Sequence, residues 1–287
     1  MWKRGGDVRA EIDRAIAGGE MDALARFLVG GRTSSARYAA RRLAERAAEA
    51  GMLSETTAGL AEHVEPVMRQ LAALLCYDAY PDAPDRTIAR LRGLADDEEP
   101  SVRDAASESA GRLLDDQFPG VVSRVEPWRD HSSANVRHAL LVAVVHATRH
   151  GQVDRAEPLL RLIGPLLTDR DPLVRRALGP AAVAALLQQY PALTFEHLIQ
   201  WSTSNDEQVL WNVAMAFTSP AASEMAKKAL IVLRKLSLDE RRYVWRAVAA
   251  AMWKLGRRRP EIVRPELARW LEDDERVEVA RAALTYL

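Results

Sequence analysis

The chain has 287 residues, of which 48% are hydrophobic and 28% are charged, so we expect a soluble protein that can bury a core. Its 40 Lys and Arg residues balance its 40 Asp and Glu residues, and a net charge of zero argues against a protein that coats nucleic acid through bulk charge. The single cysteine, Cys76, excludes an internal disulfide and an all-cysteine metal site. The absence of a signal-like start and of a long apolar run predicts a cytoplasmic location with no membrane partner.

The first third of the chain is expected to be helical. Glycine pairs punctuate its start, and short helices at about 7–17 and 20–29 fit between them. A longer helix is predicted from Thr33 to Ala50. This region lacks the repeated motif found further along, so residues 1–55 are predicted to form an N-terminal helical cap, and residues 56–287 a repeat array that the cap covers.

Residues 56–76 carry an apolar helical pattern that is broken at Pro66, which has no amide hydrogen to donate. Tyr77 to Asp85 is rich in turn-forming residues and is predicted to be the longest loop in the chain. Two roles stay open for this loop, a plain insertion or a functional segment.

From Arg86 onward one motif recurs, an acidic turn followed by a buried-type valine and an arginine. Val174-Arg175 after Asp169 and Asp171 is the clearest copy. The equivalent valines recur about every 35 residues, which indicates a stack of helix pairs. Proline marks many helix starts, where a first-turn residue donates no intrahelical bond. The predicted first helices are 86–95, 119–128, 154–168, 192–203, 221–236 and 260–271, and the second helices are 100–116, 133–150, 172–189, 206–217, 240–256 and 274–286.

This pattern resembles HEAT-like repeats, which implies an all-α fold, an α-solenoid of helix pairs. In that family the turn acid and the following arginine commonly form a ladder of hydrogen bonds between repeats. Arg103, Arg137 and Arg175 fit the arginine position, whereas Leu210 and Trp245 interrupt it. Three further tryptophans that close first helices are expected to belong to the core rather than to a binding site: Trp128, Trp201 and Trp270.

A narrower resemblance is to the bacterial alkylpurine DNA glycosylases built of HEAT-like repeats. Val174-Arg175-Arg176-Ala177 and the segment from Trp201 to Trp211 are similar to motifs of that subfamily. The resemblance implies a basic concave face that holds damaged duplex DNA, with aromatics and a carboxylate near the lesion. The sequence departs from this in one respect, because no acid lies four residues after the second-helix tryptophans Trp211, Trp245 and Trp253.

Charge is segregated along the chain. Residues 96–130 hold ten acids and four bases, whereas residues 227–269 hold thirteen bases and four acids. Arginine beside tryptophan suits phosphates and acidic protein surfaces, although a solvated helix face is the plain alternative. The candidate binding residues are Arg175, Arg176, Trp211, Arg242, Trp245, Arg246, Trp253, Arg257, Arg258 and Arg259.

No catalytic residue is assigned from the sequence, and no phosphate-cradling motif, cofactor or metal site is expected. His146 and His150 have metal-ligand spacing, but no third ligand is evident. Two functional interpretations remain. The first is a non-enzymatic scaffold that binds a macromolecule on its concave face, with an acidic protein as the preferred partner. The second is a DNA-binding or DNA-repair protein that contacts duplex DNA, and if it is an enzyme, an alkylated-base DNA glycosylase.

Overall fold

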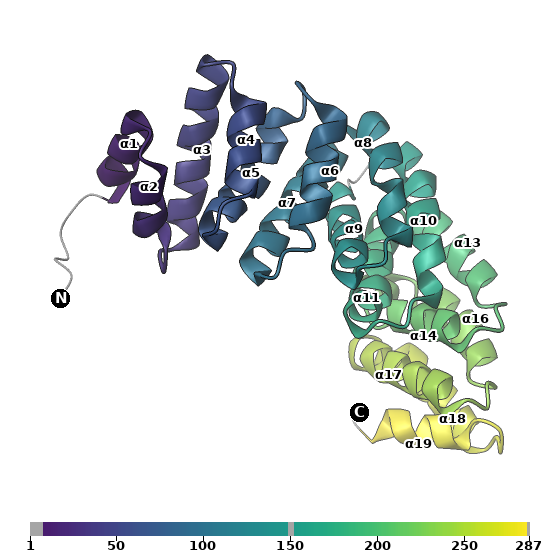
Figure 1. Ribbon diagram of the computed structural model, residues 1–287. Helices are drawn as coiled ribbons and strands as arrows, with labels where there is room; N and C mark the ends of the chain where they lie inside the picture. Colours follow the sequence, from purple (N-terminus) through teal and green to yellow (C-terminus); the bar gives the residue numbers. More distant parts are fainter. Residues whose placement is uncertain (1–7, 149–151, 286–287) are drawn as a thin grey trace, which may run out of the picture. The chain divides into compact units, whose positions relative to one another are not determined.

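The structure is a computed structural model that describes residues 8–148 and 152–285. All regular elements in these two ranges are helices, as the sequence predicts for an all-α solenoid of HEAT-like repeats (Figure 1). The chain divides into two compact units, Met1–His146 and Ala147–Leu287. The predicted cap, residues 1–55, lies inside the first unit, and its separation from the rest as a domain stays a prediction.

The first unit stacks helices in two layers. Helices α3, α5 and α7 lie side by side in one layer, and α4, α6 and α8 cover them, while α1 and α2 pack at the start of the chain. The bounds are α1 Val8–Gly18, α2 Met21–Leu28, α3 Thr33–Glu49, α4 Leu53–Ala61, α5 Pro66–Ala79, α6 Pro84–Leu94, α7 Pro100–Asp116, α8 Phe118–Val125, the short 3₁₀ helix η1 Glu126–Asp130 and α9 Ala134–Ala147.

The second unit repeats this arrangement. The second helices of its pairs are the continuous segment α11–η4–α12, then α14, α17 and α19. Helix α14 packs on η4 and on α17, and α17 packs on α19. The bounds are η2 Val153–Arg155, α10 Ala156–Ile163, η3 Gly164–Thr168, α11 Pro172–Ala177, the π-helix η4 Leu178–Val183, α12 Ala184–Gln189, α13 Pro191–Trp201, α14 Glu207–Ala216, α15 Ala221–Glu224, α16 Ala226–Leu236, α17 Arg242–Arg258, α18 Pro260–Leu271 and α19 Val277–Leu284.

The helix boundaries follow from local chemistry. Proline occupies the first or second position of many helices, including α5, α7 and α18, where its missing amide hydrogen is not needed. The first three helices end at glycines with positive φ, which residues with a Cβ adopt at a cost: Gly19, Gly30 and Gly51. Within the described residues, the predicted helix pairs agree with the structure to within a few residues, and the predicted ends at 149–150 and 286 lie outside those residues.

One sequence prediction about the first unit is wrong. Residues 77–85 do not form a long loop, because α5 continues to Ala79 and α6 already begins at Pro84. Two side chains anchor this stretch. The hydroxyl of Tyr77 donates to Asp116 at 2.7 Å, and Tyr80 is buried. The turn-forming composition misled the prediction because proline also starts helices.

The repeated valine is the anchor of each pair. Val102, Val136, Val174 and Val244 are fully buried. Cys76 is buried as expected, and desolvation raises the pKa of its thiol to about 12, which makes it unreactive. Trp128 and Trp270 lie in the core, as predicted, whereas Trp201 is only half-buried and packs against the ring of His197.

The arginine ladder takes a definite form in the first unit. Arg103 Nη1 donates to the backbone carbonyl oxygens of Asp97 and Glu98, six and five residues earlier, at 2.7 and 2.8 Å. Arg137 makes the same pair of bonds in its own turn, and so does Arg69, an arginine that the sequence analysis did not assign. Arg69 also holds Asp97 of the next repeat through two bonds of 2.7 and 2.8 Å. Arg69 thus ties two successive turns together, as the predicted ladder requires, whereas Arg103 bonds, among the described residues, only to carbonyl oxygens of its own turn and does not reach a neighbouring acid.

Within the described ranges, no helix is both long enough and apolar enough to cross a membrane.

Candidate nucleic-acid interface

Four side chains of the second unit form what we call the arginine–aromatic cluster: Arg175, Gln208, Trp211 and Tyr243. They come from α11, α14 and α17, three neighbouring second helices. The rings of Trp211 and Tyr243 are stacked, with centroids 5.7 Å apart and planes 11° apart. The guanidinium carbon of Arg175 lies 5.3 Å from the Trp211 centroid and 5.6 Å from that of Tyr243, within cation–π range of both.

Arg175 occupies the ladder position of its repeat but does not make the ladder bonds of Arg69, Arg103 and Arg137. Its Nη1 donates instead to the hydroxyl of Tyr243 at 2.9 Å. The helix that carries it ends after six residues and continues as the π-helix η4, where Gly179 lets α14 approach closely. A π-helical insertion often marks a functional position. Arg175 is therefore directed to the aromatic pair rather than to its own turn.

The polar groups of the cluster are incompletely paired. The Tyr243 hydroxyl donates to Gln208 Oε1 at 2.8 Å, and Gln208 is only 1% exposed. Arg175 Nε and Gln208 Nε2 are buried donors with no acceptor among the described residues. Buried donors are normally satisfied, so a bound water is the expected acceptor for these two. Burial raises the pKa of Tyr243, and the charge of Arg175 opposes that shift.

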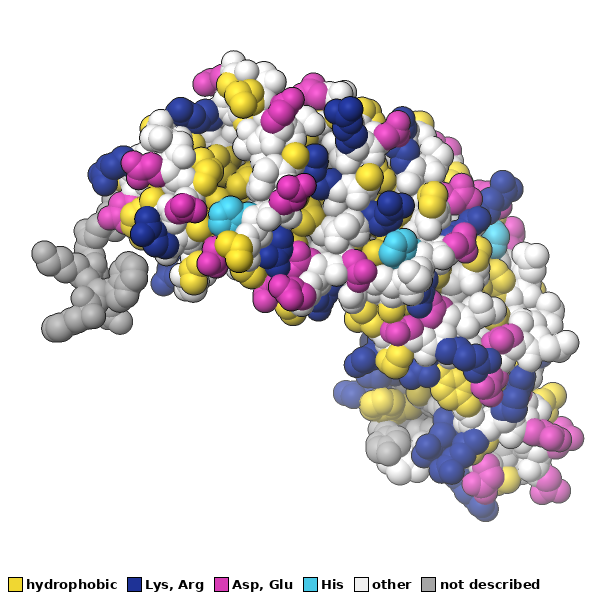
Figure 2. Space-filling view, viewed as in Figure 1, with side chains coloured by type: hydrophobic (Ala, Val, Ile, Leu, Met, Phe, Trp, Pro, Cys, Tyr) yellow, Lys and Arg dark blue, Asp and Glu magenta, His cyan; other side chains and the backbone are white. Residues whose placement is uncertain are grey.

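A basic helix face adjoins the cluster. Arg242, Arg246 and Arg257 are exposed on α17, and Trp253 is half-buried between them. At 100° per residue these four side chains fall within a sector of about 60°. Figure 2 shows Lys and Arg side chains gathered over the region of α11, α14 and α17, with hydrophobic side chains among them. We call Arg242, Arg246, Trp253 and Arg257 the α17 face.

The remaining predicted binding residues lie elsewhere. Arg176 is exposed and donates to its own helix at Pro172. Arg258 donates to the carbonyl oxygen of Thr218 at 3.1 Å, and Arg259 pairs with Glu261 at 2.7 Å, so both help to hold the chain after α17. Trp245 was grouped with the arginines, but it lies about 100° around the helix from Arg246 and lines a hollow with an acidic rim.

Two cluster residues, Gln208 and Tyr243, were missed in the sequence analysis. They are separated by 35 positions, the repeat length, so they occupy the same place in consecutive repeats. An alignment of the repeats over their full length, rather than at the valine and arginine positions alone, would have placed Gln208 and Tyr243 at equivalent positions.

The cluster contains no carboxylate. The nearby turn acids already have partners: Asp171 caps α11 by accepting from Leu173 N, Asp206 caps α14 by accepting from Gln208 N, and Asp239 binds Arg241. Glu207 pairs with Arg170 at 3.1 Å. The arrangement can therefore bind anionic and aromatic groups, but it offers no evident acid or base for a reaction.

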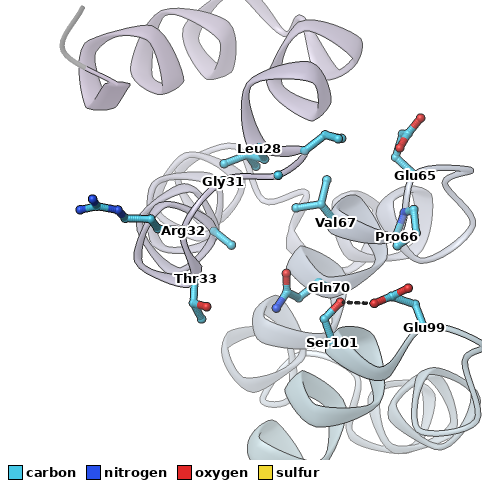
Figure 3. Close-up of a pocket in the computed structure, with 13 residues that line it drawn as sticks. Leu28, Gly31, Arg32, Thr33, Glu65, Pro66, Val67, Gln70, Glu99 and Ser101 are labelled. Carbon is cyan, nitrogen blue, oxygen red and sulfur yellow. Dashed lines mark hydrogen bonds between the residues drawn. The ribbon is translucent and has the colours of Figure 1, made fainter. Parts of the chain in front are cut away.

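Two other features lie outside the cluster. A hollow of about 300 Å³ lies where α3, α5 and α7 begin; Figure 3 shows Ser101 bonded to Glu99 in it, with Val67 and Leu28 on its wall. This bond, 3.3 Å long, joins two residues at the start of α7 that are two positions apart in the sequence. Across the residues that the structure describes, no group of acids, histidines and cysteines is placed to hold a metal ion, and His150 lies outside those residues.

Comparison with solved structures finds helical repeat proteins. The chain is 20% identical to YibA of Escherichia coli, covering 100% of this chain and 99% of that one with a TM-score of 0.43. It is 19% identical to a designed armadillo repeat protein, covering 70% of this chain and 99% of that one with a TM-score of 0.32. No curated protein matches.

A protein family described as DNA alkylation repair enzyme matches residues 21–181. The matched segment contains most of the first unit and, in the second, Arg175 and the start of η4. Because it spans more than half of the 287 residues, this chain belongs to the DNA alkylation repair enzyme family.

Proposed function

We propose that this protein binds duplex DNA in the repair of alkylated bases, and that the contact surface consists of the arginine–aromatic cluster and the α17 face. The observation that carries the proposal is the stacked pair Trp211–Tyr243 with Arg175 over both rings. Membership of the DNA alkylation repair enzyme family supports the repair role, and of the proposed contact surface Arg175 lies within the matched residues 21–181.

The physical argument rests on local charge. The chain as a whole is neutral, so binding to a polyanion requires a surface where cations are concentrated. Arg242, Arg246 and Arg257 provide such a surface, and guanidinium groups bind phosphates in pairs of hydrogen bonds. The adjacent half-buried rings of Trp211 and Tyr243 offer a stacking platform for a base or sugar.

The scaffold interpretation has less support. It rests on the helical repeat fold alone, and such folds serve many functions. An acidic protein partner would use the same arginines, so it remains the competing ligand for this surface.

The test is the salt dependence of binding to a short DNA duplex. Replacing Arg242 and Arg246 together by Ser is expected to weaken binding and to reduce the slope of log affinity against log salt by about 2, since each phosphate contact contributes about 0.9. The matched control, Lys227→Ser with Arg264→Ser, removes the same number of positive charges from the first helices of the pairs. Lys227 is exposed on α16, and Arg264 is exposed on α18. The control should keep the wild-type slope.

Two outcomes count against the proposal. Equal slopes for the two double variants would place the DNA contacts elsewhere. Binding to an acidic polypeptide such as polyglutamate, with no binding to duplex DNA at low salt, would favour a protein partner instead.

A further inference from the structure

The turns before the second helices contain a recurring acceptor site for a guanidinium. In three repeats of the first unit, two consecutive backbone carbonyl oxygens accept from one arginine, which lies six and five residues later: Arg69, Arg103 and Arg137. We call each pair of carbonyls a turn cradle. In each pair the first carbonyl is part-buried and the second belongs to an exposed residue, and the arginine donates to both.

The second unit shows what happens when the ladder arginine is absent. Leu210 stands in that position, and the carbonyl oxygen of Asn205, five residues earlier, would lose its donor. It accepts instead from Nη1 of Arg241 in the next repeat, at 2.7 Å. A guanidinium from elsewhere in the chain thus fills this turn.

The following repeat has no such replacement. Trp245 stands in the ladder position, and among the described residues no side chain donates to the carbonyl oxygens of Asp239 or Glu240. Arg276 corresponds to Arg241 one repeat on, but it donates to Asp273 and to the hydroxyl of Ser237 at 3.1 Å. The cradle of this turn therefore lacks an arginine.

An open hollow of about 510 Å³ lies at this turn. The half-buried ring of Trp245 forms one wall, with Leu238 and Val279 beside it, and carboxylates form the rim. Asp239 is neutralised by Arg241, and Glu278 pairs with Arg281 at 3.0 Å. Glu240 and Glu275 are exposed and have no cation partner among the described residues, so the rim keeps a negative balance.

We infer that this hollow, the Trp245 hollow, binds an arginine side chain of a basic segment in a protein partner. Three features select a guanidinium. The carbonyl oxygens of Asp239 and Glu240 can accept from the two hydrogens of one terminal guanidinium nitrogen, as the equivalent carbonyls do from Nη1 of Arg103. The indole ring offers a face for cation–π stacking, and the rim supplies unpaired carboxylates. A lysine ammonium is more strongly hydrated and, unlike the planar guanidinium, does not stack flat on an indole ring. The acidic rim repels phosphates, so this site is separate from the proposed DNA surface and does not depend on it.

The test uses a fluorescein-labelled peptide that carries arginines spaced by glycine and serine, and the same peptide with lysines. Fluorescence anisotropy should show the arginine peptide binding about tenfold more tightly than the lysine peptide. Trp245→Arg fills the cradle from within the chain and should abolish this binding, as should Trp245→Ala. Glu240→Gln with Glu275→Gln, which removes the two unpaired rim charges, should weaken it severalfold, whereas Glu224→Gln with Glu272→Gln, equal in charge but outside the hollow, should not.

Circular dichroism verifies that each variant is folded. If Trp245→Arg does not fold, Trp245→Ala and the double glutamine variant of the rim still test the inference. Undiminished binding by folded Trp245→Arg would overturn the inference. So would equal affinity for the arginine and lysine peptides, which would indicate unspecific attraction. If sedimentation shows wild-type self-association that Trp245→Arg removes, the occupant is a second copy of this chain and the proposed partner is wrong.

Discussion

Arg175 and Tyr243 are 68 residues apart in the sequence, yet Nη1 of the arginine donates to the tyrosine hydroxyl at 2.9 Å. The contact spans α11 and α17, with α14 between them in the chain. Because Tyr243 also stacks on Trp211, it fixes the orientation of both the indole and the guanidinium. The proposed DNA contact therefore depends on three consecutive repeats being stacked in register.

The first prediction concerns the ionisation of Tyr243. Burial raises its pKa above the usual value of about 10, and the positive charge of Arg175 limits that increase. Arg175→Met should therefore raise the pKa of Tyr243 further. The pKa is measured from the absorbance at 295 nm as a function of pH. The signal of Tyr243 is the difference between wild type, or Arg175→Met, and the same protein carrying Tyr243→Phe.

The same shift predicts an alkaline loss of stability. Because the pKa of Tyr243 is higher in the folded protein, its neutral form stabilises the fold below about pH 10, and this contribution is lost as pH rises through the folded pKa. A tyrosine pKa that does not change, or that falls, in Arg175→Met would show that the guanidinium is not held at the hydroxyl in solution.

The second prediction concerns the close approach of η4 and α14. A Cβ added to Gly179 would lie 2.7 Å from the carbonyl oxygen and 3.2 Å from the Cα of Asn212, both backbone atoms that cannot move aside cheaply. Gly179→Ala should lower the free energy of unfolding by about 1–3 kcal/mol. Urea denaturation measures this change.

Gly164→Ala is the matched control. Gly164 has helical φ and ψ, and a Cβ there would meet no atom within 4 Å. We expect it to be neutral or to stabilise the protein by about 0.4–1 kcal/mol, because alanine restricts the unfolded chain. Equal effects of the two substitutions would mean that η4 and α14 are not packed as described.

The third prediction concerns Glu266, a carboxylate only 3% exposed on α18. Hydrogen bonds from Arg234, one of them 2.8 Å long, lower its pKa, and the indole of Trp270 donates to it at 2.9 Å. A lowered pKa means that this carboxylate stabilises the fold above about pH 4.3 and that the contribution is lost as pH falls through the folded pKa. Glu266→Gln should cost about 2 kcal/mol at pH 7.

Thermal unfolding measured from pH 7 down to pH 3 tests this expectation. The difference in Tm between wild type and Glu266→Gln should shrink as the solution becomes acidic, while Glu272→Gln, at an exposed position of the same region, should show no difference at any pH. A Tm difference that is independent of pH would mean that Arg234 does not depend on the ionised form of Glu266.

The fold was predictable because its signals are local and repeated. Buried valines at a spacing of about 35 residues and prolines at helix starts define the pairs without any long-range information. The error at Tyr77 to Asp85 had a physical cause. Composition alone cannot distinguish a loop from a helix end anchored by long-range contacts, such as the hydrogen bond from Tyr77 to Asp116.

The site was only partly predictable. Arg175 and Trp211 were identified from a family motif, and the arginines of α17 from charge, but Tyr243 joins them through a contact across three helices. Trp245 shows the converse. Its neighbours in sequence are arginines, yet its position around the helix directs it to carboxylates from α19 and from its own turn. Side-chain partners of this kind depend on how the repeats stack.

The last prediction separates DNA binding from base excision. Release of an alkylated purine leaves a positively charged sugar, which a carboxylate beside an aromatic platform would stabilise. The arginine–aromatic cluster has no carboxylate, and the turn acids around it are engaged, as Asp206 is with Gln208 N at 2.7 Å and Val209 N at 3.3 Å. We therefore expect no release of methylated purines from alkylated duplex DNA even when protein exceeds DNA, although the duplex is bound. Chromatography of the released bases measures this, with Trp211→Ala as the comparison. Release that Trp211→Ala abolishes, with the helical circular-dichroism signal unchanged, would contradict this expectation and show that the protein is a glycosylase that uses this cluster. Stacking supplies affinity for the base but does not stabilise the positive charge of the sugar, so such a result would require a carboxylate from outside the cluster.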